Sequence, residues 1–390
     1  YLPIDEIESI EIIRGAKSSL YGSDAIGGII HIHTRNASTE NSSIQPVLSV
    51  GGGTYGRYKI TGGLSGKDNN NWYSLNASHE KAEGFNSCSG GCFTEEPDRD
   101  GYTNYATSVR LGHKFKKFLT LEGHLLYSSG NTDYDAATYD PNTYTNLENL
   151  NNTVDFTQLI YGGKATIKPT NFWNINLNIG ESRDESTSHD ESTDPSKKEQ
   201  ITFYNTQRFS LSFLNNFFLT KQHIVSLGYD YQDDSIDTTQ VFSGTSRNNH
   251  ATFIQYQGEW RNNTFNIAFR EDFNQQFGAN ETWNAAWGYD FDNDISVSAS
   301  YATAFKAPSF NELYWPQYGR IDIKPETSEN YELGIQGQHS HWHWSFNGYL
   351  TYINNLIGTR CNDDFSTCEA YNLNKARIMG LEAIIGGQVY

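Results

Sequence analysis

The chain has 390 residues, of which 36% are hydrophobic and 14% aromatic. It carries 28 Lys and Arg against 46 Asp and Glu, and the net charge of −18 argues against a nucleic-acid partner, because phosphate binding needs a basic surface. No run of 18 apolar residues is present, so we expect no transmembrane helix. A membrane β-barrel, whose strands alternate, stays compatible with this composition.

The first 36 residues differ from the rest. Isoleucines at positions 4, 7, 10, 12, 13, 29, 30 and 32 flank a turn-rich stretch rich in Gly and Ser. This pattern predicts a small βαβ-like element that is too short to bury a core of its own. His31 and His33 share one face of its last strand, and we expect them to pair inside this element. Residues 37–43 form a polar linker.

From residue 44 onward, apolar and polar residues alternate. In residues 173–179 every odd position is apolar and every even position is Asn, and residues 283–291 alternate in the same way. The pattern predicts about sixteen strands, each with one apolar face. The polar faces carry neutral Asn, Ser and Gln as often as charged residues. This favours a barrel with a hydrated lumen and a lipid-facing exterior over a soluble all-β protein.

The expected connections alternate between short turns and long loops. Long loops fall near residues 81–101, 128–158, 181–201, 232–250, 272–281, 304–329 and 353–372, and the one near 54–57 is short for this set. In an up-and-down barrel, all connections of one parity lie at one end. Short turns at one end and long loops at the other are typical of outer-membrane barrels.

Four cysteines form two close pairs in polar, turn-rich segments, Cys88 with Cys92 and Cys361 with Cys368. Neither pair has zinc-ligand spacing, so two local disulfides are expected, with four free thiols as the alternative. No GxSxG, HExxH or GxxxxGK[ST] motif is present, and we expect no catalytic residue.

Residues 7–34 read IESIEIIRGAKSSLYGSDAIGGIIHIHT, which resembles the end of the plug domain of TonB-dependent outer-membrane receptors, with Ala16 in place of the usual Pro. Residues 301–314, 324–334 and 374–382 resemble barrel segments of the same family, in the same order. The resemblance implies a fragment: residues 1–36 as the C-terminal part of the plug, 37–43 as a linker, and 44–390 as about 16 of 22 strands of an all-β, up-and-down antiparallel transmembrane barrel. It also implies an ion pair between Arg14 and a barrel-wall Glu.

The function implied by this resemblance is active import across the bacterial outer membrane by a monomer, powered by the TonB complex and without chemistry of its own. The partners are then outer-membrane lipid, TonB and a small-molecule ligand. Within the family the chain resembles the vitamin B12 (cobalamin) transporters most, which implies a corrinoid. A ferric siderophore, haem or another metal chelate is the alternative ligand. A passive porin or a surface-binding barrel is more remote, since a free pore needs no plug.

The resemblance also suggests ligand contacts. These are the apical plug turn and aromatic residues of the long loops: Ser18, Ser19, Leu20, Tyr21, Tyr134, Tyr314 and Trp315. Ordinary anchoring of the loops is the alternative role for the aromatic residues.

Two acidic loops complete the prediction. In cobalamin transporters, similarly placed Asp-rich loops bind calcium, and a cage of carboxylates supplies the six to eight oxygen ligands that Ca²⁺ prefers. No cofactor is expected for catalysis, and the outer loops are candidates for binding Ca²⁺. The candidate ligands are Asp133, Asp135, Asp140, Asp184, Asp190 and Asp194. The alternative is two solvated acidic loops without a metal ion.

Overall fold

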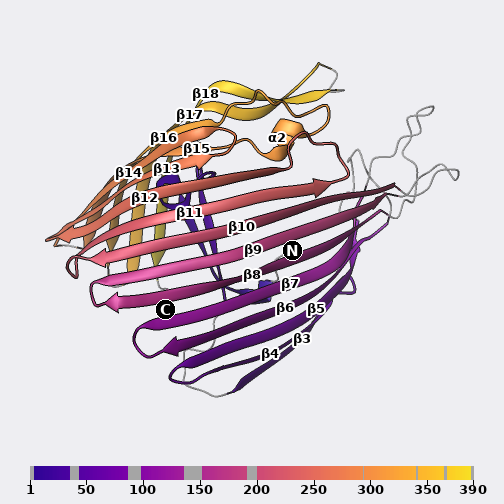
Figure 1. Ribbon diagram of the computed structural model, residues 1–390, viewed down its shortest axis with the longest axis horizontal. Coiled ribbons are helices and arrows are strands. Elements are labelled where there is room, and N and C mark those ends of the chain that lie inside the picture. Colours follow the sequence, from indigo (N-terminus) through magenta and orange to yellow (C-terminus); the bar gives the residue numbers. More distant parts are fainter. Residues whose placement is uncertain are drawn as a thin grey trace.

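The computed structural model describes residues 4–35, 44–86, 98–135, 152–190, 200–292, 294–339, 341–363 and 367–387. These residues form one large and one small β-sheet, so the expected all-β class is confirmed (Figure 1). Only three short helical segments accompany the strands in this part of the chain. None of these helices has the length and hydropathy to cross a bilayer.

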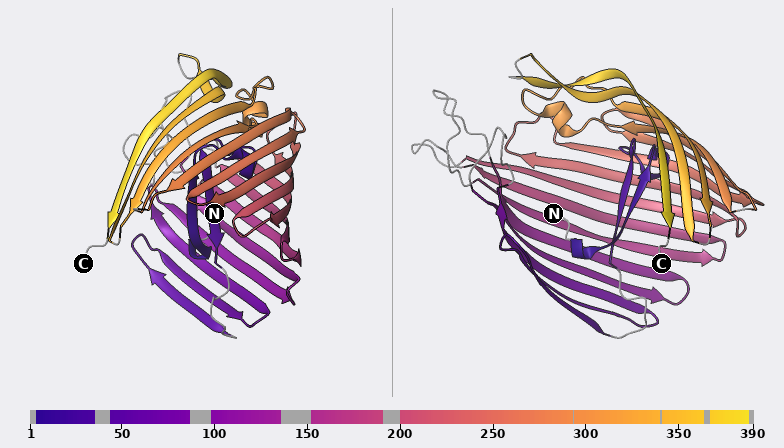
Figure 2. Two further views of the ribbon diagram at one scale, coloured as in Figure 1. Left: turned by 90° about the vertical axis from the view of Figure 1, so that its left-hand side faces the viewer. Right: turned by 180° about the vertical axis from the view of Figure 1, so that it is seen from behind.

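The large sheet has sixteen strands, the number expected from the alternation. Each strand pairs antiparallel with the next one in sequence. The sheet curves around a central space, with β3 and β18 at its two edges (Figure 2). The strands are β3 (Gln45–Gly52), β4 (Tyr58–Lys67), β5 (Asn71–Phe85), β6 (Asp100–Phe115), β7 (Leu119–Asp133), β8 (Thr153–Thr170), β9 (Trp173–Asp190), β10 (Gln200–Phe218), β11 (His223–Thr238), β12 (Ser246–Trp260), β13 (Asn263–Asn274), β14 (Gly278–Asp290), β15 (Ile295–Lys306), β16 (Glu326–Gln338), β17 (Trp342–Cys361) and β18 (Cys368–Gly387).

The connections follow the expected parity. Turns of two or three residues, such as 116–118, 171–172 and 261–262, join strands at one end of the sheet. The connections at the opposite end are longer, except for residues 275–277 between β13 and β14, and residues 307–325 carry the helix α2 (Phe310–Tyr314) there (Figure 1).

The strands extend into all seven of the expected long loops, so each connection is shorter than expected. The strand β9 continues to Asp190, and β10 begins at Gln200, so most of residues 181–201 are strand. Likewise β11 extends to Thr238, and β7 extends to Asp133. Eighteen residues at about 3.3 Å each, tilted by about 45°, rise about 40 Å, well above an apolar band of about 25 Å. Beyond that band an outward face needs no apolar side chains. The strands therefore continue to pair where apolar and polar residues no longer alternate.

The strands within the band are apolar outside and polar inside. In β14 the rings of Trp283 and Trp287 are exposed on the outer face, whereas Thr282 and Asn284, on either side of Trp283, are almost fully buried. The ring of Trp283 lies 4.2 Å from that of Phe269 on the neighbouring strand β13. This is the reverse of a soluble protein, and it is the arrangement of a barrel whose exterior meets lipid.

The small sheet is a hairpin of β1 (Ile7–Arg14) and β2 (Gly28–Thr34), preceded by the 3₁₀ turn η1 (Ile4–Glu6). The expected βαβ-like arrangement is only partly right, because the two strands are antiparallel and the helix α1 (Ser18–Tyr21) is a single turn. A connection of thirteen residues with one helical turn folds the chain straight back, whereas parallel strands need a longer crossover.

The hairpin lies on the concave side of the large sheet, in the central space (Figure 2). Ala16 and Ile26 pack against Ala302 and Ala304 of β15, together with Ile353. The backbone N–H of Asp24 donates to the carbonyl oxygen of Phe305 at 3.0 Å. Small side chains on both partners therefore let the plug approach the wall closely.

Candidate ligand-binding site

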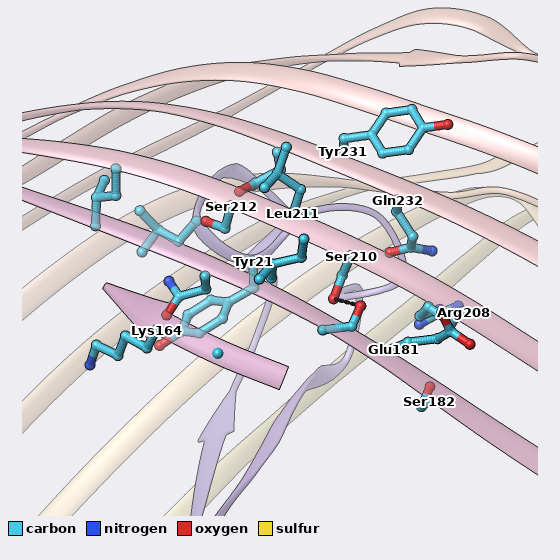
Figure 3. A pocket seen from close by; sticks show the side chains of 18 of the residues that line it. Tyr21, Lys164, Glu181, Ser182, Arg208, Ser210, Leu211, Ser212, Tyr231 and Gln232 are labelled. Atoms are coloured by element: carbon cyan, nitrogen blue, oxygen red, sulfur yellow. Dashed lines mark hydrogen bonds between the residues drawn. The ribbon is translucent and has the colours of Figure 1, made fainter. Parts of the chain in front are cut away.

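A cavity of about 1230 Å³ lies between the plug hairpin and the inner face of strands β6 to β13. The plug contributes Leu20 and Tyr21 from α1, Gly22 and Ser23 beyond it, and His33 from β2. Much of the wall is neutral and polar, with amide and hydroxyl side chains such as Asn178, Ser210, Ser212, Gln232, Asn249 and Gln255. Figure 3 shows part of this wall, with Tyr21 among side chains of the barrel strands. The cavity can thus offer many uncharged hydrogen-bonding groups.

Two arginines of the cavity are matched by carboxylates. The side chain of Arg270 is only 3% exposed, and its guanidinium lies 2.9 Å from Asp272 and 2.5 Å from Asp230. It also lies over the ring of Phe253, 5.5 Å from the centroid. Arg208 donates two hydrogen bonds, of 2.6 and 3.1 Å, to the carboxylate of its cross-strand partner Asp234. These pairs neutralise two of the cations that line the cavity, which also include Lys164 and Arg110, a donor to the hydroxyl of Thr34.

The strand pattern explains how these charges meet. Arg270 and Asp272 are two residues apart in β13, so both point inward, and Asp230 reaches them from β11. None of these residues was among those expected from the sequence to form a site. The available signal was a charged residue on the polar face of a barrel strand, which marks the lumen.

The apical plug turn is divided between burial and exposure. Ser18 and Ser19 are fully buried, and the Oγ of Ser18 accepts a 3.4 Å hydrogen bond from the N–H of Phe305. Leu20 and Tyr21 line the cavity, and Tyr21 is 51% exposed. Only this second half of the expected turn therefore presents side-chain surface to a ligand in this structure.

Tyr314 and Trp315 belong to an aromatic group around α2, at the end of the sheet with the long connections. The helix starts with a capping box between Ser309 and Glu312. The hydroxyl of Tyr314 accepts a 2.6 Å hydrogen bond from Gln276, and Trp315 packs edge-on against Phe242. Neither residue is among those that line the cavity. Both make anchoring contacts, which is the alternative role expected for these aromatic residues.

The expected calcium ligands do not form one group. Asp184 pairs with Gln158 and Thr206 in the middle of the ladder, six residues below Asp190. Six residues of strand span about 20 Å, so including Asp184 in a shared cage was wrong. Asp190 instead accepts a hydrogen bond from the hydroxyl of Tyr134. Asp140 and Asp194 lie outside the described residues.

A different set of carboxylates does converge. Oxygen atoms of Asp98, Asp100 and Asp135 lie within 4.8 Å of one another, where the connection before β6 meets the end of β7. Asp133 is close by and accepts a 3.1 Å hydrogen bond from the N–H of Gly101. Burial raises the pKa of Asp133 above its ordinary value. The hydrogen bond from Gly101 N–H lowers this pKa, and the negative charges of Asp100 and Asp98 raise it further. Sequence reasoning missed Asp98 and Asp100, although their stretch EEPDRD is acidic.

Only one of the two cysteine pairs lies within the described residues. Cys361 and Cys368 face each other at the ends of β17 and β18 and are joined by a disulfide. Cys88 and Cys92 lie outside the described residues.

A multi-stranded barrel-type sheet with an apolar exterior, and a small plug docked in its centre, defines a plugged membrane-barrel receptor. Family models agree with this class: the β-barrel of TonB-dependent receptors matches residues 36–389, and the receptor plug domain matches residues 1–29. The chain belongs to the TonB-dependent receptor family.

Curated relatives are similar along almost the whole chain. A vitamin B12 transporter, BtuB, from Photobacterium profundum is 30% identical over 99% of this chain and 61% of its own length. A BtuB from Vibrio cholerae is 28% identical over 98% of this chain and 59% of its own length. The chain thus spans about three fifths of the curated relatives that it matches.

Solved structures share the fold at lower identity. A variant of the ferric enterobactin receptor PfeA from Pseudomonas aeruginosa superposes with a TM-score of 0.79 at 18% identity, covering 98% of this chain and 65% of that one. The copper transporter OprC has a TM-score of 0.79 at 13% identity, covering 99% and 65%.

Proposed function

We propose that the protein to which this chain belongs imports cobalamin or a related corrinoid across the bacterial outer membrane, driven by TonB. The observation that carries this is the 27–30% identity to vitamin B12 transporters over 98–99% of the chain. The siderophore and copper receptors of similar fold are only 13–18% identical, a level that speaks for architecture alone.

The chemistry of the cavity supports a large, uncharged ligand. Cobalamin carries many amide groups, and the wall offers amides and hydroxyls as partners. A ferric catecholate chelate is strongly anionic and would need unpaired cations, because a desolvated charge must be matched. Arg270 and Arg208 are already matched by Asp272 and Asp234. The overall charge of −18 opposes an anion as well.

The plug is held in a way that suits its displacement. Its described contacts with the wall are a small cluster of alanines and isoleucines, a few hydrogen bonds, and an ion pair between Arg14 and Glu382. Arg14 is largely exposed, and an exposed ion pair contributes at most about 1 kcal/mol. A pull transmitted through the plug can therefore break these contacts in turn and free a ligand held beside Leu20 and Tyr21.

Calcium is part of the proposal. Asp98, Asp100 and Asp135, with Asp133 beside them, offer the all-oxygen donor set that Ca²⁺ prefers, and they come from two neighbouring strand ends. Burial raises the pKa of Asp133 most, and the negative charges of Asp100 and Asp98 add to it, so a divalent cation bound here would stabilise the ionised carboxylate. A bound ion would tie the two connections together at the mouth of the barrel.

The decisive experiment is cyanocobalamin binding by the complete receptor in detergent, with calcium and then with chelator. Tight binding that weakens with chelator supports both the ligand and the calcium site. Binding that is indifferent to chelator keeps the ligand and removes the metal. No binding in either condition overturns the corrinoid proposal. A parallel titration with a ferric catecholate siderophore then tests the alternative, a metal-chelate receptor.

A further inference from the structure

The plug hairpin carries a cluster of two histidines and a carboxylate, of which only His33 lines the candidate ligand cavity. Glu11 of β1 lies directly opposite His31 of β2, and His33 follows two residues later on the same face. The rings of His31 and His33 are 4.1 Å apart, and Glu11 Oε1 lies 3.4 Å from His33 Nε2. The two histidines pair as expected, but His31 and Glu11 are exposed and His33 is half-buried, so the expected burial of the pair was wrong.

We propose that Glu11, His31 and His33 bind a divalent transition-metal ion of the kind that prefers imidazole, such as Zn²⁺ or Cu²⁺. One donor atom from each side chain lies within 4.8 Å of the other two. Two imidazoles and a carboxylate form a three-ligand set that leaves further positions for water or a ligand group. Calcium is a poor match, because it prefers oxygen donors.

The distances fit a small ion. Metal–ligand bonds of about 2.1 Å place two ligands of a tetrahedral site about 3.4 Å apart. The separation between Glu11 Oε1 and His33 Nε2 has this value. The third donor needs only a small rotation of a side chain, since a directly opposite pair such as Glu11 and His31 starts with its Cβ atoms about 5 Å apart.

An unsatisfied atom points to the same place. The Nε2 atom of His33 is shielded from solvent and has no hydrogen-bond partner within the described part of the chain, although the imidazole as a whole is partly exposed. A buried polar atom without a partner costs free energy. Coordination of an ion between His33, Glu11 and His31 would satisfy it, whereas a simple ion pair with Glu11 would leave His31 without a role.

A metal ion at this position would affect the plug hairpin. Because Glu11 lies on β1 and both histidines lie on β2, a bound metal would join the two strands of the hairpin. His33 also lines the central cavity, together with Glu122 and His124 of β7, so a bound ion would lie at the border of that space. This inference does not depend on which ligand the receptor imports.

The test counts nitrogen ligands. The complete receptor is purified without a histidine tag, stripped with chelator, loaded with one equivalent of Cu²⁺, and studied by electron paramagnetic resonance. We expect the hyperfine pattern of two imidazole nitrogens in the wild type and of one in His31→Asn or His33→Asn. Zn²⁺ titration should show a loss of affinity of at least ten-fold in either variant and in Glu11→Gln.

A matched control removes a histidine elsewhere. His223 of β11 shares a 2.8 Å hydrogen bond with the hydroxyl of Tyr256, far along the chain from the hairpin. The variant His223→Asn should leave the spectrum and the Zn²⁺ affinity unchanged. Circular dichroism and gel mobility after heating confirm that each variant is folded. A two-nitrogen pattern that survives in both hairpin variants, or a wild type that binds no Zn²⁺ above the micromolar range, overturns the proposal.

Discussion

Gly22 of the plug lies directly against Arg270 of the barrel wall: a Cβ atom at Gly22 would come within 3.2 Å of the guanidinium Nη2. Gly22 also has φ +90° and ψ −168°, a backbone conformation that is essentially restricted to glycine. The apical turn of the plug thus meets the most deeply buried ion pair of the cavity, between Arg270 and Asp272, at a position that tolerates no side chain.

Gly22→Ala should therefore loosen the apical turn. Backbone strain of about 1–3 kcal/mol adds to the close contact with Arg270. Hydrogen exchange of residues 15–27 in the complete receptor should become faster. Gly27→Ala is the matched control, since a Cβ there meets no atom within 4 Å and the residue has no positive φ. Equal exchange in both variants would contradict this account.

Arg270→Met should destabilise the barrel strongly. It leaves Asp272, which is 1% exposed, without its cation, and breaking a buried ion pair costs about 3–5 kcal/mol. Arg208→Met is the comparison, because Arg208 is half exposed and its pair with Asp234 is expected to contribute about 1 kcal/mol or less. Unfolding midpoints in detergent, read from heat-dependent gel mobility, should fall much more for Arg270→Met. Similar shifts would argue that the lumen is hydrated around Asp272.

Arg14→Ala should weaken retention of the plug and reduce uptake in cells. The expected pairing of Arg14 with a wall Glu is confirmed, with Glu382 of β18 as the partner. The exposed position predicts a small effect on stability, of about 1 kcal/mol or less. The double exchange Arg14→Glu with Glu382→Arg should recover most of the loss. Uptake unchanged in Arg14→Ala would refute a role for the pair.

Tyr21→Ala should weaken binding of cyanocobalamin about ten-fold, because the half-exposed ring is the largest plug side chain that lines the cavity. Tyr331→Ala, which removes an exposed ring from outside the cavity, is the control and should bind as the wild type does. Isothermal titration in detergent measures both. Unaltered binding by Tyr21→Ala would place the ligand elsewhere, above the plug.

Calcium binding should depend on pH in a defined direction. Because the pKa of Asp133 is raised on folding, its ionised form destabilises the folded state, and this cost disappears as the pH falls below the ordinary value of 3.8. In chelator, the unfolding midpoint of the wild type should thus rise relative to that of Asp133→Asn as the pH falls from 7 toward 4. Protons compete with calcium, so calcium affinity should decrease over the same interval.

Two variants test which carboxylates bind the calcium ion. Asp135→Asn should lower calcium affinity at least ten-fold, and Asp190→Asn, whose carboxylate binds Tyr134 instead, should leave it nearly unchanged. If Asp190→Asn is the variant that loses calcium, the cluster of Asp98, Asp100 and Asp135 is not the site.

Much of this fold was predictable, because the information is local. A period of two along the strand sets which side chains face lipid, as at Trp283 and Trp287, and repeating it sets the number of strands. The plug segment, and the pairing of Arg14 with a wall Glu, were predicted from a family resemblance that a short run of residues carries. Where alternation fades above the bilayer, as in residues 182–190, the same reasoning mistook strand for loop.

Only the tertiary structure decided which residues far apart in the sequence come into contact. Register brings Asp98 and Asp100 to Asp135 and keeps Asp184 about 20 Å below Asp190, although all belong to acidic stretches. The docking of the plug buries Ser18 and Ser19 and leaves Tyr21 in the cavity. The reason is physical: sequence periodicity determines the face on which a side chain lies, whereas its height on that face, and hence its partners, depends on hydrogen-bond register and docking between segments far apart in the chain.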